Sequence, residues 1–464
     1  MKQSDIRVLE ATAYFPQAVC RTPLKFGAVV VESLAFCHVK MTVENRAGNK
    51  ASGWGAMFLM DMWGWPSPLV PHELRGQIME EFVRRLCRVY ENLSDYGHPI
   101  EHFHQVESEF VSLATDICRE EGAAEVMPYL CQLVAASPVD AACHDAFGIV
   151  NDLPTYQCYG PEHMNDDLSR YLGEEFTGRY VSDYLQARMP ERIPAFHLVG
   201  GLDKLRESEV TDNDPQDGLP VSLDQWIRYD HLHCLKVKLK GTDLDWDVSR
   251  IDEVVSIAQE EHDRLGLSGL WFSADTNEQC ESPDYIIEMI ARLKERNPQA
   301  ERELLYIEQP TERDLRRHRF DMRELAKIKP VIIDESLMTL DDFRLALELG
   351  WSGIALKACK CQSGALLFAS LAEHSRIPYT IQDLTNPGIA LIQSVALAGH
   401  LKPLKGVEAN SRQFFAGTNE PEARVHPGVF KLQDGCITST TIGGPGIGYR
   451  WNQIDRSFDP SGTQ

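Results

Sequence analysis

Five short apolar runs in the middle of the chain each end on a charged residue. They cover residues 235–238, 270–275, 304–308, 331–334 and 353–357, and their last residues are Lys238, Asp275, Glu308, Asp334 and Lys357. Runs this short, bounded by polar turns, are typical of strands buried in a parallel sheet. Because charged side chains are rarely buried without a partner, charge at the same end of five strands predicts one shared site.

The segments between these runs have the pattern of helices. Ile251, Val254, Val255 and Ala258 lie on one helical face, and Gly266 can end that helix. Similar patterns occupy residues 284–293, 341–349 and 365–372. Alternating strands and helices predict a parallel α/β fold. A (β/α)8 barrel would gather the C-terminal strand ends at one mouth, where such barrels carry their active sites.

The rest of the chain predicts an α+β capping domain beside the barrel. Residues 1 to about 60 have the pattern of antiparallel strands, and residues 72 to about 150 are mostly helical. The remaining barrel strands are expected at residues 193–199, 378–383 and 406–408. The predicted domains are a cap at residues 1–188, a barrel at 189–414 and a C-terminal tail at 415–464 that returns to the cap.

Residues 53–66 contain three tryptophans, three methionines and several glycines. A mobile, apolar segment of this kind favours a lid over a ligand. The alternative is a buried strand and turn between the two domains.

The composition is that of a globular protein with a strong acidic excess. Of 464 residues, 43% are hydrophobic and 25% charged, and the net charge is −23. This charge argues against a nucleic-acid or anionic-membrane partner, but local lysines could still bind a small anion. The N-terminus lacks the apolar stretch of a secretory signal, and no apolar run approaches the roughly 20 residues that span a bilayer. The twelve cysteines form no framework and indicate reduced thiols, so we expect a cytoplasmic protein.

Asp275, Glu308 and Asp334 would repel one another at a shared mouth. A hard divalent cation would relieve this repulsion, and oxygen-only ligands with open coordination positions suit Mg²⁺. The ion could hold a substrate carboxylate and stabilise the negative charge that develops on it. The alternative is a set of structural salt bridges with the lysines.

Lys236 and Lys238 are two residues apart, so they share one face of their strand. Two adjacent ammonium groups near a cation disfavour each other's charged form. The pKa of either is therefore expected to fall from about 10.4 toward the operating pH, as a general base requires. Lys357 enters from the other side of the barrel, so the lysines could remove and return a proton. Lys240, beside Gly241, is expected to be a solvated lysine.

Two weaker motifs favour structural interpretations. His98, His102 and His104 could suggest zinc, but Pro99 interrupts a helix there and no further ligand has convincing spacing. We therefore expect solvated or hydrogen-bonded histidines. The glycines of residues 443–448 are followed by neither Lys-Ser/Thr nor a helix, so they predict a turn and not a phosphate loop.

Together these residues resemble the muconate-lactonizing-enzyme subgroup of the enolase superfamily. The matching motifs are Lys236-Val237-Lys238, Asp275-Thr276-Asn277, Glu308-Gln309-Pro310, Asp334-Glu335-Ser336 and Lys357, on the second to the sixth strands. Their order and spacing agree together, which is more specific than any single match. Residues 21–26 and 53–55 resemble its capping domain, and residues 145–148 resemble the helix that enters its barrel.

The resemblance implies Mg²⁺-assisted abstraction of the proton α to a carboxylate, which gives an enediolate. It implies that the metal ligands are Asp275, Glu308 and Asp334. Lys238 would be one acid/base residue, Lys357 the opposite one, and Lys236 the electrostatic neighbour of Lys238.

The resemblance also implies that cap loops near residues 14–19 and 54–66 select the substrate. The expected substrate contacts are Asp383, Glu408 and Trp54. We expect the partners to be a small-molecule carboxylate and further copies of the chain in a homo-oligomer.

Three departures from the family pattern bear on the reaction. Lys240 stands where a glycine is common, and Gly364 stands alone where a pair of glycines is usual. Asp383-Leu384-Thr385 replaces the paired aspartates of dipeptide epimerases, which argues against a dipeptide substrate. Cycloisomerase, racemase or epimerase, dehydratase and succinylbenzoate-synthase-like chemistry stay open. A different class, a non-catalytic metal- and carboxylate-binding relative, is disfavoured by the intact lysines.

Overall fold

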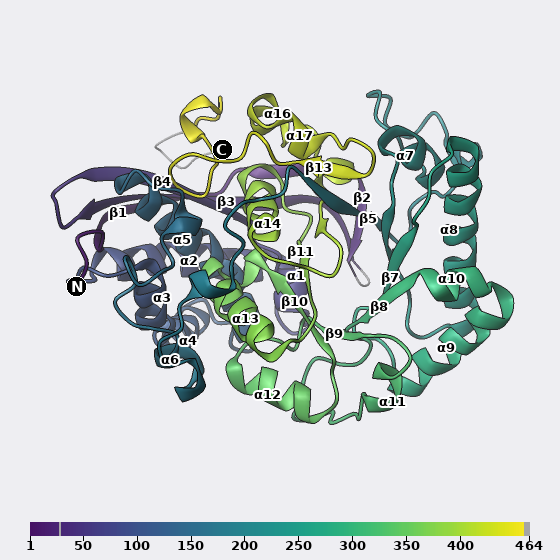
Figure 1. The fold of residues 1–464 in the computed structure, drawn as a ribbon, viewed down its shortest axis with the longest axis horizontal. Coiled ribbons are helices and arrows are strands. Elements are labelled where there is room, and N and C mark those ends of the chain that lie inside the picture. Colours follow the sequence, from purple (N-terminus) through teal and green to yellow (C-terminus); the bar gives the residue numbers. More distant parts are fainter. Residues whose placement is uncertain (27–28, 459–464) are drawn as a thin grey trace.

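Eight parallel strands close into a barrel in the computed structural model, which describes residues 1–26 and 29–458 (Figure 1). The strands are β5 (Arg192–Val199), β6 (Cys234–Lys238), β7 (Trp271–Asp275), β8 (Leu304–Glu308), β9 (Val331–Ile333), β10 (Gly353–Lys357), β11 (Tyr379–Gln382) and β12 (Val407–Glu408). Each strand pairs with the next in the sequence, and β12 closes the ring by placing Val407 opposite Ala195 of β5. The predicted (β/α)8 barrel is confirmed.

Helices follow the barrel strands and cover their outer side. They are α7 (Leu223–Asp230), α8 (Leu244–Leu265), α9 (Pro283–Arg296), α10 (Pro298–Glu303), α11 (Arg323–Ala326), α12 (Leu340–Glu348), α13 (Gln362–Ser375), α14 (Gly388–His400) and α15 (Ser411–Phe414). Helix α8 buries the apolar face predicted for it, including Ile251 and Val255. It ends at Gly266, whose φ of 68° is in the left-handed region that favours glycine.

The N-terminal region forms the predicted α+β cap. Its antiparallel sheet contains β1 (Ile6–Tyr14), β2 (Gln17–Phe26), β3 (Val29–Asn45) and β4 (Lys50–Phe58), and β3 pairs with the other three strands. The helices that follow include α1 (Asp61–Gly64), α2 (His72–Glu91), α3 (Pro99–Glu107), α4 (Phe110–Glu120) and α5 (Tyr129–Val150). Figure 1 shows this cap beside the barrel, with the C-terminal segment running along both.

Strand β4 and helix α5 approach closely because two glycines have no side chain. A Cβ atom on Gly53 would lie 2.1 Å from the backbone nitrogen of Ala146, and one on Gly55 would lie 2.1 Å from the carbonyl oxygen of Pro138. Both distances are far below van der Waals contact. The strand that leads toward α1 is therefore fixed directly against the central helix of the cap.

Helix α5 corrects one expectation from the sequence. By length and composition alone it could cross a membrane, contrary to the expectation that no apolar run is long enough. However, 94% of its most apolar window is buried within the protein. A helix that is hydrophobic on all sides is typical of a protein core, and α5 occupies that position in the cap.

The C-terminal tail contacts both domains. Strand β13 (Cys436–Thr438) pairs antiparallel with β5, a contact that the sequence pattern did not predict. Further along, the backbone N–H of Ile447 donates to Asp145 of α5 at 2.8 Å, and Trp451 stacks on Trp54 of β4 with ring centroids 4.1 Å apart. Residues 459–464 of the predicted tail lie outside the described residues, and the domain boundaries themselves stay predictions.

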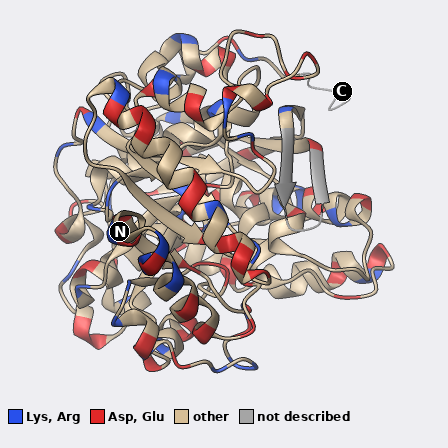
Figure 2. Cartoon of the chain, turned by 90° about the vertical axis from the view of Figure 1, so that its right-hand side faces the viewer, with Lys and Arg blue, Asp and Glu red and all other residues tan. Residues whose placement is uncertain are grey.

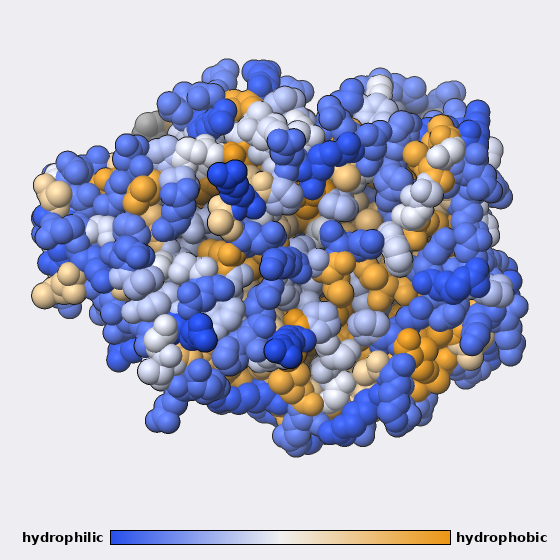
Figure 3. Space-filling view, viewed as in Figure 1, coloured by the Kyte–Doolittle hydropathy of each residue, from blue (hydrophilic) through white to orange (hydrophobic). Residues whose placement is uncertain are grey.

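Charged residues are spread over the molecule (Figure 2), as expected for a chain in which 25% of the residues are charged. Figure 2 shows Asp and Glu residues interspersed with Lys and Arg over the helices and loops. The face in Figure 3 is mostly hydrophilic, with scattered apolar patches.

Asp145 generates a prediction about stability and pH. Its Oδ2 accepts a hydrogen bond from the backbone N–H of Trp54 at 2.9 Å, and its Oδ1 accepts one from the backbone N–H of Ile447. Burial raises the pKa of Asp145 to about 7, and these two hydrogen bonds offset only part of that effect. In the unfolded chain an aspartate has a pKa of about 3.9. The proton therefore stabilises the folded state fully below about pH 4, and this stabilisation is lost as the pH rises through about 7.

We expect Asp145→Asn to remove this dependence. The wild-type free energy of unfolding minus that of the variant should fall by about 2 to 3 kcal/mol between pH 5 and pH 8, because each pH unit between the two pKa values contributes about 1.4 kcal/mol. Denaturant titrations at both pH values measure the difference. Glu121→Gln, a change at an exposed carboxyl group, should keep the wild-type pH dependence. A pH dependence of Asp145→Asn equal to that of the wild type would contradict the assignment.

Candidate active site

The barrel brings the predicted lysines and carboxylates together at the C-terminal ends of its strands. Lys238 lies opposite Asp275 in the sheet, and Asp275 lies opposite Glu308. Asp334 directly follows β9, and Lys357 ends β10. The small pocket between these strand ends is lined by Trp63, Leu198, Lys236, Lys238, Asn277, Asp334, Glu335, Lys357, Asp383, Leu384, Thr385, Glu408 and Asn410.

Lys236 is buried at the centre of an ion-pair network. Its Nζ donates to Glu308 Oε1 and to Glu408 Oε1, both at 2.8 Å, and lies 3.2 Å from Asp275 Oδ2. Burial disfavours the charged ammonium, but the negative charges of Glu308, Glu408 and Asp275 outweigh it and raise the pKa of Lys236 well above its ordinary value. Without a bound cation, the pKa of Lys236 thus shifts upward because three carboxylates surround this ammonium group, and the fall expected for either lysine beside a cation stays a prediction.

Lys238 is the more accessible of the two lysines on β6. Its side chain is 21% exposed, and its Nζ lies 2.5 Å from Asp275 Oδ2. The other oxygen of Asp275 accepts the N–H of Asn277 at 2.8 Å. Burial alone would raise the pKa of Asp275, but Lys238 and Lys236 hold it below its ordinary value.

Asp334 binds two lysines from the opposite side of the mouth. Lys357 Nζ lies 2.6 Å from Asp334 Oδ2, and Lys360 Nζ lies 3.2 Å from Oδ1. Burial favours the neutral acid, but the charges of Lys357 and Lys360 lower the pKa of Asp334 to about 2. Burial also works against the ammonium of Lys357, and Asp334 raises its pKa above the ordinary value nonetheless.

Glu308 is the least well compensated of the three predicted metal ligands. Burial and the nearby charge of Asp275 raise the pKa of Glu308 to about 8, although Lys236 opposes this effect. Gln382 on β11 donates to its second oxygen at 2.6 Å. A closer positive charge would favour the ionised form of Glu308.

Asp383 and Glu408, two predicted substrate contacts, both line the pocket. Asn410 donates to both, at 3.2 Å to Asp383 Oδ1 and at 3.3 Å to Glu408 Oε2. Burial and the charge of Glu408 raise the pKa of Asp383 to about 7. Glu408 already accepts a hydrogen bond from Lys236, so it also belongs to the ion-pair network.

Trp54, the third predicted substrate contact, lies elsewhere. Its ring packs against Trp451 and Phe458 of the tail, and it is not among the residues that line the pocket. Trp54 stays a predicted substrate contact that the lining of this pocket does not include, since β4 turns this side chain toward the tail. Residues 54–60 are buried as a strand and its end, which fits the alternative to a lid. Trp63 of the same segment does line the pocket, and only its place among the three tryptophans signalled it.

Among the pocket and network residues that were not predicted as site residues are Glu335, Lys360 and Asn410. Glu335 accepts the indole N–H of Trp63 at 2.9 Å, and Lys360 holds Asp334. Asn410 joins Asp383 to Glu408. Glu335 directly follows a predicted ligand, and Lys360 lies one helical turn beyond Lys357, so spacing alone could have indicated both. Asn410 had no such signal.

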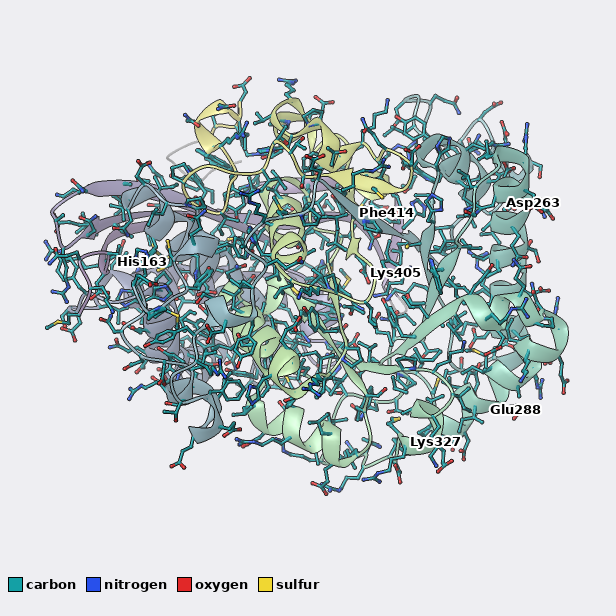
Figure 4. All side chains as sticks on the ribbon, in the orientation of Figure 1. His163, Asp263, Glu288, Lys327, Lys405 and Phe414 are labelled. Atoms are coloured by element: carbon teal, nitrogen blue, oxygen red, sulfur yellow. The ribbon has the colours of Figure 1, made fainter. Side chains whose placement is uncertain are left out.

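A second cavity of about 620 Å³ lies between β5, the segment that precedes α7, and β2 of the cap. Phe414, labelled in Figure 4, lines it together with Leu198, which also lines the catalytic pocket. Its basic side chains are paired: Arg21 with Asp217, and Lys204 with Asp214, each at 2.5 Å. Arg21 and Lys204 therefore already have anionic partners.

Two histidines of the predicted group, His98 and His102, are hydrogen-bonded within the cap, and His104 is exposed. His98 caps α3 and its Nε2 lies 3.2 Å from the carbonyl oxygen of Cys158, while His102 Nε2 lies 2.9 Å from that of Ile6. Pro99 begins the helix instead of interrupting it. Both histidines are buried and hydrogen-bonded, so they are not solvated.

Whether the pocket suits a divalent cation depends on its donor atoms. Among residues 1–26 and 29–458, no three His, Cys, Asp or Glu side chains already stand as a metal-binding group, since lysine ammonium groups lie between the carboxylates. The donors are nevertheless all oxygen, and carboxylates outnumber the lysines. The acids are Asp275, Glu308, Asp334, Glu335, Asp383 and Glu408; the lysines are Lys236, Lys238, Lys357 and Lys360. This excess of buried oxygen donors fits a hard cation such as Mg²⁺.

Comparisons with known proteins agree with this arrangement. A family model described as enolase C-terminal domain-like matches residues 222–455, half of the chain. No curated protein matches the sequence.

Among solved structures, the L-Ala-D/L-Glu epimerase from Bacillus subtilis is 16% identical with a TM-score of 0.61, covering 95% of this chain and 98% of its own. An enolase from Bradyrhizobium complexed with magnesium and mandelic acid is 18% identical with a TM-score of 0.59, covering 96% and 95%. Muconate lactonizing enzyme from Klebsiella pneumoniae is 14% identical with a TM-score of 0.56, covering 95% and 96%. At these identities the likeness shows the fold alone, while the family model covers the strands that carry the pocket. The chain belongs to the enolase superfamily.

Proposed function

We propose that this protein is a Mg²⁺-dependent enzyme that removes the proton α to a substrate carboxylate. The observation that supports this most directly is the placement of Lys238 and Lys357 on two sides of one pocket, each paired with a different carboxylate. Superfamily membership supports the same chemistry, and solved relatives are described with Mg and a dipeptide or with magnesium and mandelic acid. The reaction class is isomerase or lyase: racemase or epimerase, cycloisomerase, or dehydratase.

Asp275, Glu308 and Asp334 would hold the cation. When bound, Mg²⁺ supplies positive charge that stabilises the anion formed from the substrate carboxylate. To bind the Mg²⁺ ion, Asp275 would release Lys238 and Asp334 would release Lys357. The same exchange would free both ammonium groups to face a substrate.

The three lysines take different roles because their surroundings differ. Lys236 is bound by three carboxylates and is nearly inaccessible, so we assign it a purely electrostatic role. Lys238 and Lys357 line the pocket from strands β6 and β10, with β7 to β9 between them. Each would exchange a proton with one face of the α-carbon. Asp383 lines the same pocket and would contact the rest of the substrate.

The wider setting follows the same proposal. All twelve cysteines are free thiols, which supports a cytoplasmic location. A small carboxylate is the proposed ligand, and a homo-oligomer the proposed assembly. The pattern Asp383-Leu384-Thr385 argues against a dipeptide substrate.

Metal affinity tests the ligand assignment. We expect Asp275→Asn, Glu308→Gln and Asp334→Asn each to weaken Mg²⁺ binding at least tenfold by isothermal titration calorimetry, because each removes one anionic oxygen donor. Asp243→Asn, a change at an exposed carboxylate paired with Lys240, should leave the affinity within twofold. Unchanged affinity in all three ligand variants would refute the assignment.

Proton exchange in D₂O tests the roles of the lysines. If the reaction is a 1,1-proton transfer, Lys238→Ala should abolish deuterium wash-in from one enantiomer of the substrate and Lys357→Ala from the other. In an elimination or cycloisomerisation only one lysine need act as base. Lys240→Ala is the matched control, since Lys240 pairs with Asp243 outside the pocket.

Two results would count against this proposal. Full exchange of both enantiomers by either single lysine variant would refute the two-faced assignment. Metal binding without exchange from any carboxylate tested would favour a non-catalytic metal- and carboxylate-binding relative.

A further inference from the structure

Trp63 brings the cap into contact with the catalytic lysines. It belongs to the short helix α1, its side chain is only 4% exposed, and it lines the catalytic pocket. Its Nε1 donates to Glu335 Oε1 at 2.9 Å, so the indole is oriented by a barrel residue. The second oxygen of Glu335 is buried and has no hydrogen-bond partner among the residues that the structure describes.

The face of the indole is turned toward two ammonium groups. Lys357 Nζ lies 4.7 Å from the ring centroid, and Lys360 Nζ lies 5.5 Å from it. Both distances are within the roughly 6 Å at which a cation is attracted to an aromatic face, and tryptophan provides the strongest such attraction. This attraction is larger in a desolvated site, and Lys357 is almost fully buried.

The backbone of Trp63 is also attached to the barrel. Arg313 donates to its carbonyl oxygen at 2.9 Å, and the same guanidinium binds Glu278 with its Nε 2.8 Å from Oε2. Glu278 lies in the loop after β7, and Arg313 in the segment after β8. The indole is therefore fixed at its edge by Glu335 and at its backbone by Arg313, which makes it a rigid support.

The two lysines that we propose as acid/base groups, Lys238 and Lys357, differ in their contacts with aromatic rings. In the described part of the chain, aromatic rings lie within cation–π distance of Lys240, Lys357, Lys360, Lys405 and Lys431, but not of Lys238. The polar partner of Lys357 is Asp334, which would turn toward the cation under the proposed function. The indole face would then be the support that Lys357 retains.

We propose that Trp63 is a positioning residue for Lys357: the indole face holds the ammonium group at its edge of the pocket. The cap thereby determines the position of one of the two acid/base groups, in addition to covering the site. Lys238 is positioned by the barrel alone. This inference rests on the proposed function for its catalytic consequence, but the contact itself can be tested without any substrate.

The first test is the rate at which an amine-acetylating reagent modifies Lys357 in the full-length protein without metal, followed by peptide mass spectrometry. Trp63→Leu removes the aromatic face, whereas Trp63→Phe keeps a face and removes the N–H donor. We expect at least fivefold faster acetylation of Lys357 in Trp63→Leu and less than a twofold change in Trp63→Phe. Acetylation of Lys238 should change less than twofold in both variants.

Trp65→Phe is the matched control. The N–H of Trp65 also donates to a glutamate, Glu125 at 2.6 Å, but Trp65 does not line the pocket. Its variant should leave the acetylation of Lys357 unchanged. If Trp63→Leu does not fold, as judged by circular dichroism, Trp63→Met supplies the ring-free comparison. Equal acetylation of Lys357 in the wild type and in the ring-free variant, or equal increases in the Phe and ring-free variants, would overturn the proposal.

The second test separates this inference from the proposed function. With an exchangeable carboxylate and Mg²⁺, the ring-free variant should slow wash-in at the face served by Lys357 at least tenfold and leave the other face within twofold. Equal slowing at both faces would overturn the positioning role even if the enzyme is active. Faster acetylation of Lys357 with no exchange in the wild type would support the contact and refute the proposed function.

Discussion

The structure of the barrel mouth depends on the compensation of buried negative charge. Carboxylates at the ends of β7, β8 and β12 and after β9 would repel one another strongly if they were left alone. Lys236 binds three of them at once. Lys238 also binds Asp275, and Asp334 is bound by two further lysines, Lys357 and Lys360. The network is incomplete, since burial leaves the pKa values of Glu308 and Asp383 raised to about 8 and about 7. A further cation near these carboxyl groups would favour their ionised forms.

The cap is built to reach this mouth. Gly53 and Gly55 let β4 lie directly on α5, and β4 leads into the short helix that carries Trp63. Asp145 of α5 accepts N–H groups from β4 and from the tail, so one buried carboxyl group connects three segments that are distant in sequence. The tail in turn pairs with β5. Packing within the cap thus brings Trp63 to Lys357, and Glu335 and Arg313 of the barrel hold it there.

The sequence predicted the parts of the molecule that follow from local periodicity. Short apolar runs ending on Lys238, Asp275, Glu308 and Lys357 located the barrel strands, because buried parallel strands have a distinctive pattern. The choice between Trp54 and Trp63 depended on how β4 packs against the tail, which periodicity does not encode. The upward pKa shift of Lys236 without a bound cation had no local signal, because Glu408, far along the chain, completes its surroundings. Pairing of β13 with β5 is likewise a long-range contact without a local signal.

The central claim is that the lysines occupy positions on carboxylates that a divalent cation would take over. The most direct measurement is a crystal structure of the protein with Mn²⁺, whose anomalous scattering locates the ion unambiguously. The account predicts one ion bound by Asp275, Glu308 and Asp334, with Lys238 moved away from Asp275 and Lys357 from Asp334. An ion bound elsewhere, or those two ion pairs unchanged in the presence of saturating Mn²⁺, would contradict it.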